Sequence, residues 1–223
     1  MHEILATRPV IPVIEIENPD DAEPLANALL AGGIDVIEIT FRTAAGADAI
    51  DRIRKSVPDM IVGAGTVVTG EQAKRAIDLG VAFGVAPGLN ETTVDLFSSS
   101  KIPFLPGVAT ASEVEKGLAL GCKALKFFPA AAAGGPAMLK ALSGPYASHG
   151  VTFCPTGGIN LQNMNDYLSL PIVSSIGGSW IASRSNVSQK QWGVIEKQAA
   201  EALVQQRKIA LTDRADLQKF VFF

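Results

Sequence analysis

The chain has 223 residues, of which 48% are hydrophobic and 18% charged, and its formal net charge is -3. A chain of this length can bury one large core, so a single domain over residues 1–223 is the simplest prediction. The slightly negative charge and the lack of a basic run exclude the electrostatic footprint of a nucleic-acid-binding protein, so we expect a small-molecule partner.

Two further compositional features concern location and covalent chemistry. The first ten residues, MHEILATRPV, lack the charged region and long apolar run of a signal peptide, and no stretch resembles a membrane span, which predicts a cytoplasmic protein without membrane contact. Cys122 and Cys154 lie in apolar segments, and His2 and His149 are isolated. We therefore predict neither a disulfide framework nor a metal site.

An apolar run, a turn with Gly, Pro or Thr, and an amphipathic helical stretch repeat along the chain. The helices are punctuated by Gly32-Gly33, by Pro58, and by Thr69 and Gly80, which we expect to be an N-cap and a C-terminal stop. The predicted strands, in chain order, cover residues 9–16, 34–40, 60–64, 81–86, 102–105, 124–127, 151–154 and 172–176.

This alternation predicts the fold. Parallel strands need a crossover that is usually helical, and near-continuous apolar runs suit strands covered on both faces. Eight such units predict an α/β fold, a single (β/α)8 TIM barrel with parallel strands, its core at residues 9–182 and a C-terminal helix and tail at residues 188–223. An open doubly wound sheet is the alternative, less favoured because no GxGxxG motif follows an early strand.

The sixth predicted strand, within ALKFFP at residues 124–129, contains a lysine among apolar residues. Burial of an unpaired ammonium is costly, which favours the uncharged amine, a nucleophile able to form a Schiff base with a carbonyl substrate. Alternatively, the stem of Lys126 could lie on apolar surface while its head reaches solvent. Lys123 falls on the other face, near the opposite end of the strand, and we expect it to be solvated.

Glu38 is a second isolated charge, in the segment VIEITFR. A carboxyl group among apolar neighbours suits proton transfer, although an acid near a lysine can equally form a structural ion pair. Two isolated charges on separate strands favour the catalytic interpretation. Glu15 is a rival at the end of the first strand, but the neighbouring Glu17 suggests that the chain is leaving the barrel there, so we interpret Glu15 as solvated or structural.

Glycine pairs follow the last two predicted strands, in the segments TGG at 156–158 and GGS at 177–179. Glycines let backbone N–H groups approach an anion, and helix N-termini add a favourable dipole. Each pair alone could simply form a tight turn, but both together at these strands favour a phosphate site and a phosphorylated substrate. Arg42 offers a planar fork for a carboxylate, with Thr66 as a hydroxyl partner, or else begins a helix at the surface.

Seven motifs resemble those of a known family: VIEITFR, VGAGTV, PGL, PFLPGVAT, ALKFFPA, FCPTGGI and SSIGGSW. In this order they are similar to the class I aldolases that cleave 2-keto-3-deoxy-6-phosphogluconate (KDPG), some of which also act on 4-hydroxy-2-oxoglutarate (KHG). The resemblance covers roughly residues 9–182 and is specific for KFFP, FCPTGGI and GGSW together. It implies a lyase of the Entner-Doudoroff pathway that needs no metal or other cofactor and is commonly a homotrimer.

The resemblance also implies roles for individual residues. Lys126 would form the Schiff base, and Glu38 would be the general acid and base. The other implied site residues are Arg42, Thr66 and Thr156 at the carboxylate end of the substrate, Gly157, Gly158, Gly177, Gly178 and Ser179 at its phosphate, and Pro87 and Phe128 along the pocket wall.

The chain departs from the family pattern in two places. Relatives tend to carry Glu and Asn after KFFPA, whereas Ala131, Ala132 and Ala133 precede a glycine pair in this chain. The segment after about residue 208, which ends in KFVFF, lies outside the resemblance, and an apolar end of this kind is typical of a helix or strand packed on the body or on a partner.

Two other functions fit the same predicted fold and phosphate loops. A sugar-phosphate isomerase or epimerase would use Lys126 only electrostatically, and a sugar-phosphate sensor would bind its ligand without chemistry. A covalent pyruvate adduct on Lys126, trapped by borohydride, is expected of the aldolase alone.

Overall fold

The computed structural model describes residue 4 and residues 7–219, with side chains as far as residue 208. His2, most of the N-terminal segment and the last four residues of the KFVFF tail lie outside the described residues.

Nine short strands form the centre of the part of the chain that the structure describes. Every pairing between them is parallel. One sheet has the order β5-β4-β3-β2-β1-β9 and the other the order β6-β7-β8. Their bounds are β1 (Val10–Ile14), β2 (Val36–Thr40), β3 (Ile61–Gly65), β4 (Phe83–Val85), β5 (Phe104–Leu105), β6 (Gly107–Val108), β7 (Ala124–Phe127), β8 (Thr152–Pro155) and β9 (Ile176–Gly178).

The prediction of a closed (β/α)8 TIM barrel is wrong. The strands form a curled, open α/β arrangement of a six-stranded and a three-stranded sheet. Pro106 follows the predicted fifth strand and separates β5 from a further short strand, β6: β5 pairs with β4, whereas β6 pairs with β7. Proline has no N–H to continue a ladder, so the chain changes sheets at this residue. At the other junction an isolated bridge joins Thr156 and Gly177 in place of a continuous ladder between β8 and β9.

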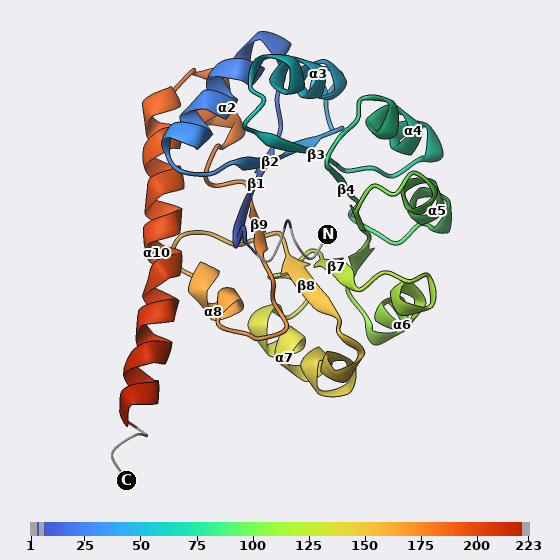
Figure 1. Cartoon of the computed structure of the whole chain (residues 1–223), viewed down its shortest axis with the longest axis vertical. Coiled ribbons are helices and arrows are strands. Elements are labelled where there is room, and N and C mark those ends of the chain that lie inside the picture. Colours follow the sequence, from blue (N-terminus) through green and yellow to red (C-terminus); the bar gives the residue numbers. More distant parts are fainter. Residues whose placement is uncertain (1–3, 5–6, 220–223) are drawn as a thin grey trace.

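Helices surround the strands and lie on the outside of the molecule (Figure 1). Their bounds are α2 (Ala22–Ala31), α3 (Gly46–Ser56), α4 (Gly70–Asp78), α5 (Glu91–Ser99), α6 (Ala111–Ala119), α7 (Gly135–Tyr146), α8 (Met164–Leu168), α9 (Arg184–Ser188) and α10 (Trp192–Lys219), with 3-10 turns at η1 (Pro19–Asp21) and η2 (Ala147–His149). The predicted alternation of parallel strands with helices is confirmed.

The predicted boundaries of α4 are confirmed in detail. The Thr69 hydroxyl accepts a hydrogen bond from the Gln72 N–H, and the Gln72 side chain accepts one from the Thr69 N–H. This capping box satisfies donors that the first turn of a helix leaves unpaired. Gly80 follows the last turn with φ +66°, a conformation that glycine adopts more easily than other residues.

Helix α10 runs along one side of the molecule beside α2 and α8 (Figure 1). Its buried side chains include Ile195, Ala199 and Ala202. Gly32, at the end of α2, permits the close approach, because a Cβ atom there would lie 2.5 Å from the Ala199 Cβ and 2.5 Å from the Glu196 carbonyl oxygen. The glycine that ends α2 therefore also makes room for α10.

This contact predicts that Gly32→Ala destabilises the fold. The added methyl group meets helix backbone that cannot move independently, and overpacking of this kind costs about 1–3 kcal/mol. Urea unfolding should show the loss. The matched control is Gly193→Ala, since a Cβ at that position in α10 meets nothing within 4 Å; it should unfold at the same urea concentration as the parent or a higher one. Equal stability of the Gly32→Ala protein and the parent would contradict the packing argument.

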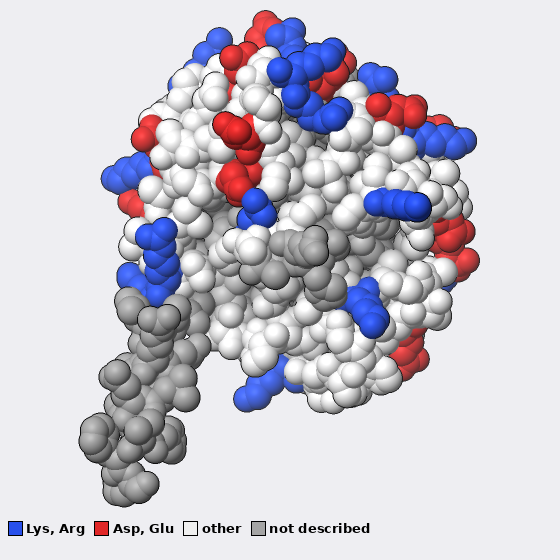
Figure 2. Space-filling view, viewed as in Figure 1, with Lys and Arg blue, Asp and Glu red and all other residues white. Residues whose placement is uncertain are grey.

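Charges of both signs are mixed over the surface. On the face shown in Figure 2, Lys and Arg side chains lie among Asp and Glu side chains along the upper and right edges, and a few charged side chains lie nearer the middle. Some form exposed ion pairs, such as Lys55 with Asp51 and Lys116 with Glu91, at 2.7 Å each; such pairs contribute little to folding. None of the helices in the described residues is long and apolar enough to cross a membrane.

Candidate active site

Lys126 and Glu38 meet in the space between the two sheets. Lys126 is the third residue of β7 and Glu38 the third residue of β2, so the contact joins side chains from different sheets. The Lys126 Nζ donates a hydrogen bond to the Glu38 Oε1 over 3.4 Å, and each side chain is only 4% exposed. The structure thus brings together the two isolated charges of the sequence and excludes the solvated alternative for Lys126.

A glycine on the neighbouring strand gives the Glu38 carboxyl group its space. Gly65 ends β3, next to β2, and a Cβ at this position would lie 2.2 Å from the Glu38 Oε1. No larger residue fits without displacing the carboxylate. Gly65 was not among the predicted site residues, although it lies within the VGAGTV motif.

Thr66 directly follows β3 and has an unusual backbone. Its φ is +58°, in the left-handed region that β-branched residues rarely occupy. Such a conformation costs on the order of 1–3 kcal/mol and persists only where the surroundings impose it. Thr66 follows Gly65, which contacts the Glu38 carboxyl group. A strained residue at this place supports a functional position for Thr66.

Arg42 lies at the surface beyond β2, with a side chain that is 46% exposed. Its Nη1 lies 3.8 Å from the Glu15 Oε2, and the other oxygen of Glu15 lies 3.0 Å from the Arg184 Nη1. Arg184 also contacts Glu17, and this carboxylate raises the pKa of the Arg184 guanidinium. Glu15 therefore holds surface ion pairs, in agreement with its structural interpretation. The sequence did not predict the ion pairs of Arg184, because its partners Glu15 and Glu17 are distant in the chain and no local pattern marks them.

The two glycine loops lie next to each other, since the Thr156–Gly177 bridge joins them. Gly157 and Gly158 have φ values of +103° and +77°. A Cβ at Gly177 would lie 2.3 Å from the Thr156 Oγ1, and one at Gly178 would lie 1.8 Å from the Trp180 ring. Glycine is therefore required here by close packing. Ser179 is exposed beside this pair.

The expected helix dipoles are not found at these loops. The helices that follow β8 and β9 have only five residues each and begin at Met164 and Arg184, several residues beyond the glycine pairs. Backbone N–H groups of the loops themselves, and the Ser179 hydroxyl, are the donors that the arrangement offers to an anion.

The turn after β7 lies against the first glycine loop. The Ala131 N–H donates a hydrogen bond to the Gly157 carbonyl over 3.0 Å, and a Cβ at Gly158 would lie 2.5 Å from the Ala131 Cβ. The alanines that depart from the family pattern are therefore close to the candidate phosphate site. Their small side chains leave this edge of the site apolar.

Two apolar side chains complete the predicted set. The Phe128 ring centroid lies 5.5 Å from the Lys126 Nζ, within the range of a cation–π contact. Pro87 follows β4 and lines a cavity of about 220 Å³ together with Val67 and Ala86. Phe128 therefore lies beside Lys126, whereas Pro87 shares a cavity with Val67, the residue that follows Thr66.

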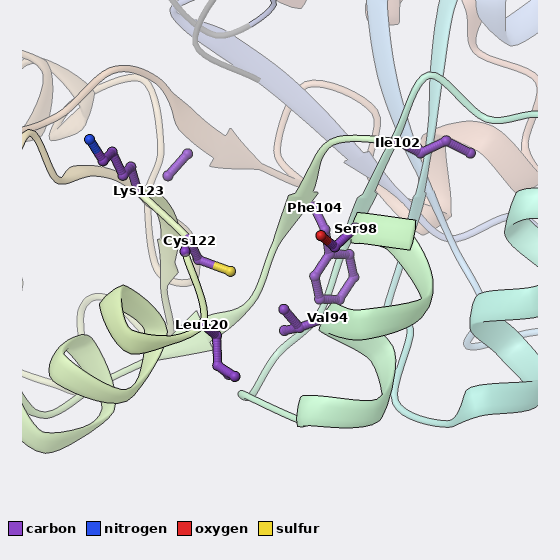
Figure 3. A pocket seen from close by; sticks show the side chains of 9 residues that line it. Val94, Ser98, Ile102, Phe104, Leu120, Cys122 and Lys123 are labelled. Carbon is purple, nitrogen blue, oxygen red and sulfur yellow. The ribbon is translucent and has the colours of Figure 1, made fainter. Parts of the chain in front are cut away.

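A larger cavity of about 320 Å³ lies at the opposite, amino ends of the strands and is lined by none of the predicted site residues. Figure 3 shows the Cys122 sulfur pointing toward the side of Phe104, whereas the Lys123 side chain points away. Burial raises the pKa of the Cys122 thiol. Lys123 is exposed, so its interpretation as a solvated residue is confirmed.

No group of three or more His, Cys, Asp and Glu side chains in the described residues could hold a metal ion. The site thus consists of an amine, a carboxyl group, hydroxyl groups and backbone N–H groups. Such a set can attack a carbonyl carbon, transfer protons and bind anions.

Comparisons with known proteins agree with this chemistry. Residues 1–198 match the family described as KDPG and KHG aldolase. The chain is 44% identical to the KHG/KDPG aldolase of Escherichia coli K12, over 90% of this chain and 93% of that protein. It is similar to the crystal structure of Legionella pneumophila KDPG aldolase with pyruvate captured as a covalent carbinolamine intermediate, with 44% identity, a TM-score of 0.87, and coverage of 90% of this chain and 97% of that one. A cube-shaped cage designed by fusing symmetric oligomeric domains matches 96% of this chain and 78% of its own, with 25% identity and a TM-score of 0.85.

Proposed function

This chain belongs to the KDPG and KHG aldolase family, and we propose that it cleaves KDPG to pyruvate and glyceraldehyde 3-phosphate through a Schiff base on Lys126. It is a class I aldolase, a carbon–carbon lyase. The observation that carries the assignment of the site is the buried contact, 3.4 Å long, between the Lys126 amine and the Glu38 carboxyl group. The name of the Escherichia coli relative supports KHG as a second substrate, cleaved to pyruvate and glyoxylate.

The first half of the mechanism is formation of the iminium ion. The uncharged Lys126 amine attacks the C2 ketone of the substrate, and Glu38 transfers the protons that convert the carbinolamine to the iminium ion with loss of water. The apo contact between these groups is long, and such contacts commonly tighten when substrate binds. The Legionella relative was captured with pyruvate at the carbinolamine stage, which supports this sequence of steps.

The second half breaks the carbon–carbon bond. The iminium ion accepts the electrons of the C3–C4 bond once the C4 hydroxyl group loses its proton, which Glu38 takes through a water molecule. Glyceraldehyde 3-phosphate leaves, the enamine is protonated at C3, and hydrolysis of the imine releases pyruvate and the free amine. The iminium ion is itself the electron sink, so these steps require no metal or other cofactor.

The remaining residues are assigned to substrate binding. Arg42, Thr66 and Thr156 would bind the carboxylate of the pyruvate half, while Gly157, Gly158, Gly177, Gly178 and Ser179 would bind the phosphate group. Pro87 and Phe128 would line the pocket between them. The adjacency of the two glycine loops and the strained backbone of Thr66 support this arrangement.

We further propose that residues 1–223 form one domain that assembles as a homotrimer in the cytoplasm. The match to a cage built from symmetric oligomeric domains supports an oligomer, and sedimentation equilibrium would give its size. A phosphorylated keto acid carries several negative charges and does not cross a bilayer unaided, so its cleavage takes place in the compartment where it is made.

The decisive test of the function is incubation of the protein with pyruvate and borohydride. A reduced adduct located on Lys126 by peptide mass spectrometry, together with pyruvate release from KDPG, is the expected result. A sugar-phosphate isomerase or a non-catalytic sensor would give neither. Pyruvate release from a panel of 2-keto-3-deoxy sugar acids would rank the substrates and give the stereochemical preference at C4.

The space that Gly65 leaves for Glu38 predicts that Gly65→Ala is strongly impaired. The new methyl group would lie 2.2 Å from the present Glu38 Oε1 position, so the carboxyl group must move. Misplacement of a catalytic group by about 1 Å can cost about 100-fold, so we expect kcat for KDPG cleavage to fall by about 10- to 100-fold. Gly88→Ala is the control, because a Cβ there meets nothing within 4 Å. A Gly65→Ala enzyme with the parent kcat would show that Glu38 tolerates displacement.

A further inference from the structure

Two polar side chains beside the catalytic pair have no part in the mechanism above. They are the thiol of Cys154 on β8 and the hydroxyl group of Ser175, which immediately precedes β9. Cys154 is the partner of Lys126 in the register of β7 and β8, so both side chains emerge on the same side of the sheet. Two isolated bridges, Phe153–Val173 and Thr156–Gly177, set this segment beside β8, so Ser175 lies between the bridged positions, close to the level of Cys154. Both residues are buried.

The Ser175 hydroxyl has unused hydrogen-bonding capacity. It is completely buried, yet within the described residues its Oγ has no partner in ordinary hydrogen-bond geometry. Buried hydroxyl groups are usually paired, so an unpaired one suggests a role. The Cys154 thiol is a polar neighbour of this hydroxyl group, since Ser175 lowers the pKa of that thiol.

Cys154 stays protonated and uncharged near neutral pH. Burial is the largest effect on this group and raises the pKa of its thiol to about 11. The thiol also interacts electrostatically with Lys126 on β7 and Glu38 on β2, and it contacts Thr156 on its own strand. It is therefore a neutral S–H group that faces both members of the catalytic pair.

The attacking lysine needs a second acceptor inside the protein. An uncharged amine has one lone pair and two N–H groups. For attack on C2 the lone pair must point at the substrate, so both N–H groups must point into the protein. Glu38 accepts one of them. The side chain level with Lys126 on the next strand is Cys154, and a thiol can accept the other N–H at sulfur while it donates its S–H.

We propose that Cys154 and Ser175 are positioning residues for Lys126, which rests on the Schiff-base function proposed above. The Lys126 N–H donates to the Cys154 sulfur, and the Cys154 S–H donates to the Ser175 Oγ. This chain of hydrogen bonds fixes the rotation of the amine about its Cε–Nζ bond, so that its lone pair faces the carbonyl carbon. No bond to Cys154 or Ser175 forms or breaks, and all three groups are uncharged at the moment of attack.

The test uses the full chain with Cys154→Ala, Cys154→Ser and Ser175→Ala. The measured quantities are the initial rate of borohydride-trapped pyruvate adduct, and kcat and KM for KDPG cleavage. We expect Cys154→Ala to lower the trapping rate and kcat about tenfold with KM unchanged, because orientation and not binding is lost. Cys154→Ser, which keeps a donor and an acceptor, should recover most of the rate. Ser175→Ala should lower it about threefold.

Cys122→Ala is the matched control, the same change at a half-buried cysteine in the cavity at the other end of the strands (Figure 3). It should trap pyruvate at the parent rate, and thermal unfolding would confirm that each variant is folded. If both Cys154→Ala and Ser175→Ala trap pyruvate at the parent rate, the positioning role is overturned while the proposed aldolase function stands. A Cys154→Ser enzyme as slow as Cys154→Ala would overturn the positioning role as well, since it would indicate that the thiol only fills space. A parent protein that traps no pyruvate would overturn the proposed function itself.

Discussion

Replacement of Lys126 with methionine is expected to abolish KDPG cleavage and pyruvate trapping while the chain still folds. Methionine has a similar length and suits the apolar surroundings of β7, but it has no amine to attack the ketone. Loss of the nucleophile in an enzyme with a covalent intermediate typically costs at least about 10⁴-fold in kcat. Glu38 loses the partner of its buried hydrogen bond, which lowers stability but leaves the apolar packing of β7 in place. Pyruvate release and a cooperative thermal transition are the two measurements.

The chain provides a matched control for this experiment. Lys123 lies three residues earlier and is exposed, at the amino end of the same strand. Lys123→Met should therefore keep the parent kcat and the parent adduct. Cleavage that survives Lys126→Met, or an adduct that forms in that variant, would reject Lys126 as the Schiff-base residue.

Glu38→Gln is expected to slow proton transfer without removing the nucleophile. The amide keeps the volume of the carboxyl group but cannot exchange a proton, so both imine formation and enamine protonation should become slower. Removal of a general acid–base group costs about 10²- to 10⁴-fold. NMR spectroscopy of the exchange of pyruvate methyl protons with D2O measures the enamine step directly, and borohydride trapping measures the first step.

Glu15→Gln separates this role from a general effect of negative charge. Glu15 is the other acid that the sequence offered near a strand end, and it holds ion pairs with Arg184 and Arg42 at the surface. At saturating pyruvate its exchange rate should stay close to that of the parent. An unchanged exchange rate in the Glu38→Gln enzyme would instead argue that another group moves the proton.

Much of the candidate site was predictable because local patterns mark it. Lys126 and Glu38 are charged residues within apolar strand segments. Because burial of a charge costs free energy, a charge in such a segment suggests a function even from a single sequence. The strand positions followed from apolar runs bounded by glycine and proline, and the predicted cap at Thr69 followed from local hydrogen bonding. These signals depend on residues a few positions apart.

Other features of the site had no local signal. Gly65 in contact with the Glu38 carboxyl group, the Arg184–Glu15 ion pair and the approach of Ser175 to Cys154 all join segments that are distant in sequence. In the sequence, a glycine that leaves room for a carboxylate cannot be distinguished from a glycine in an ordinary turn. The prediction of helix dipoles at the two glycine loops was wrong for a similar reason, since the length of a helix after a loop depends on packing.

The sequence alone determined that the chain is an α/β protein of parallel strands and marked Lys126 and Glu38 as isolated charges in apolar strand segments. The alternation of strand and helix patterns, the apolar runs and the isolated charges each reflect how favourable it is to bury individual residues, and this can be judged from the sequence. Only the tertiary structure decided that the strands divide into two sheets at Pro106, and that Lys126 meets Glu38 across them, 88 residues apart. Strand pairing and closure depend on which distant backbones exchange hydrogen bonds, and a repeat of eight units does not specify whether its ends meet.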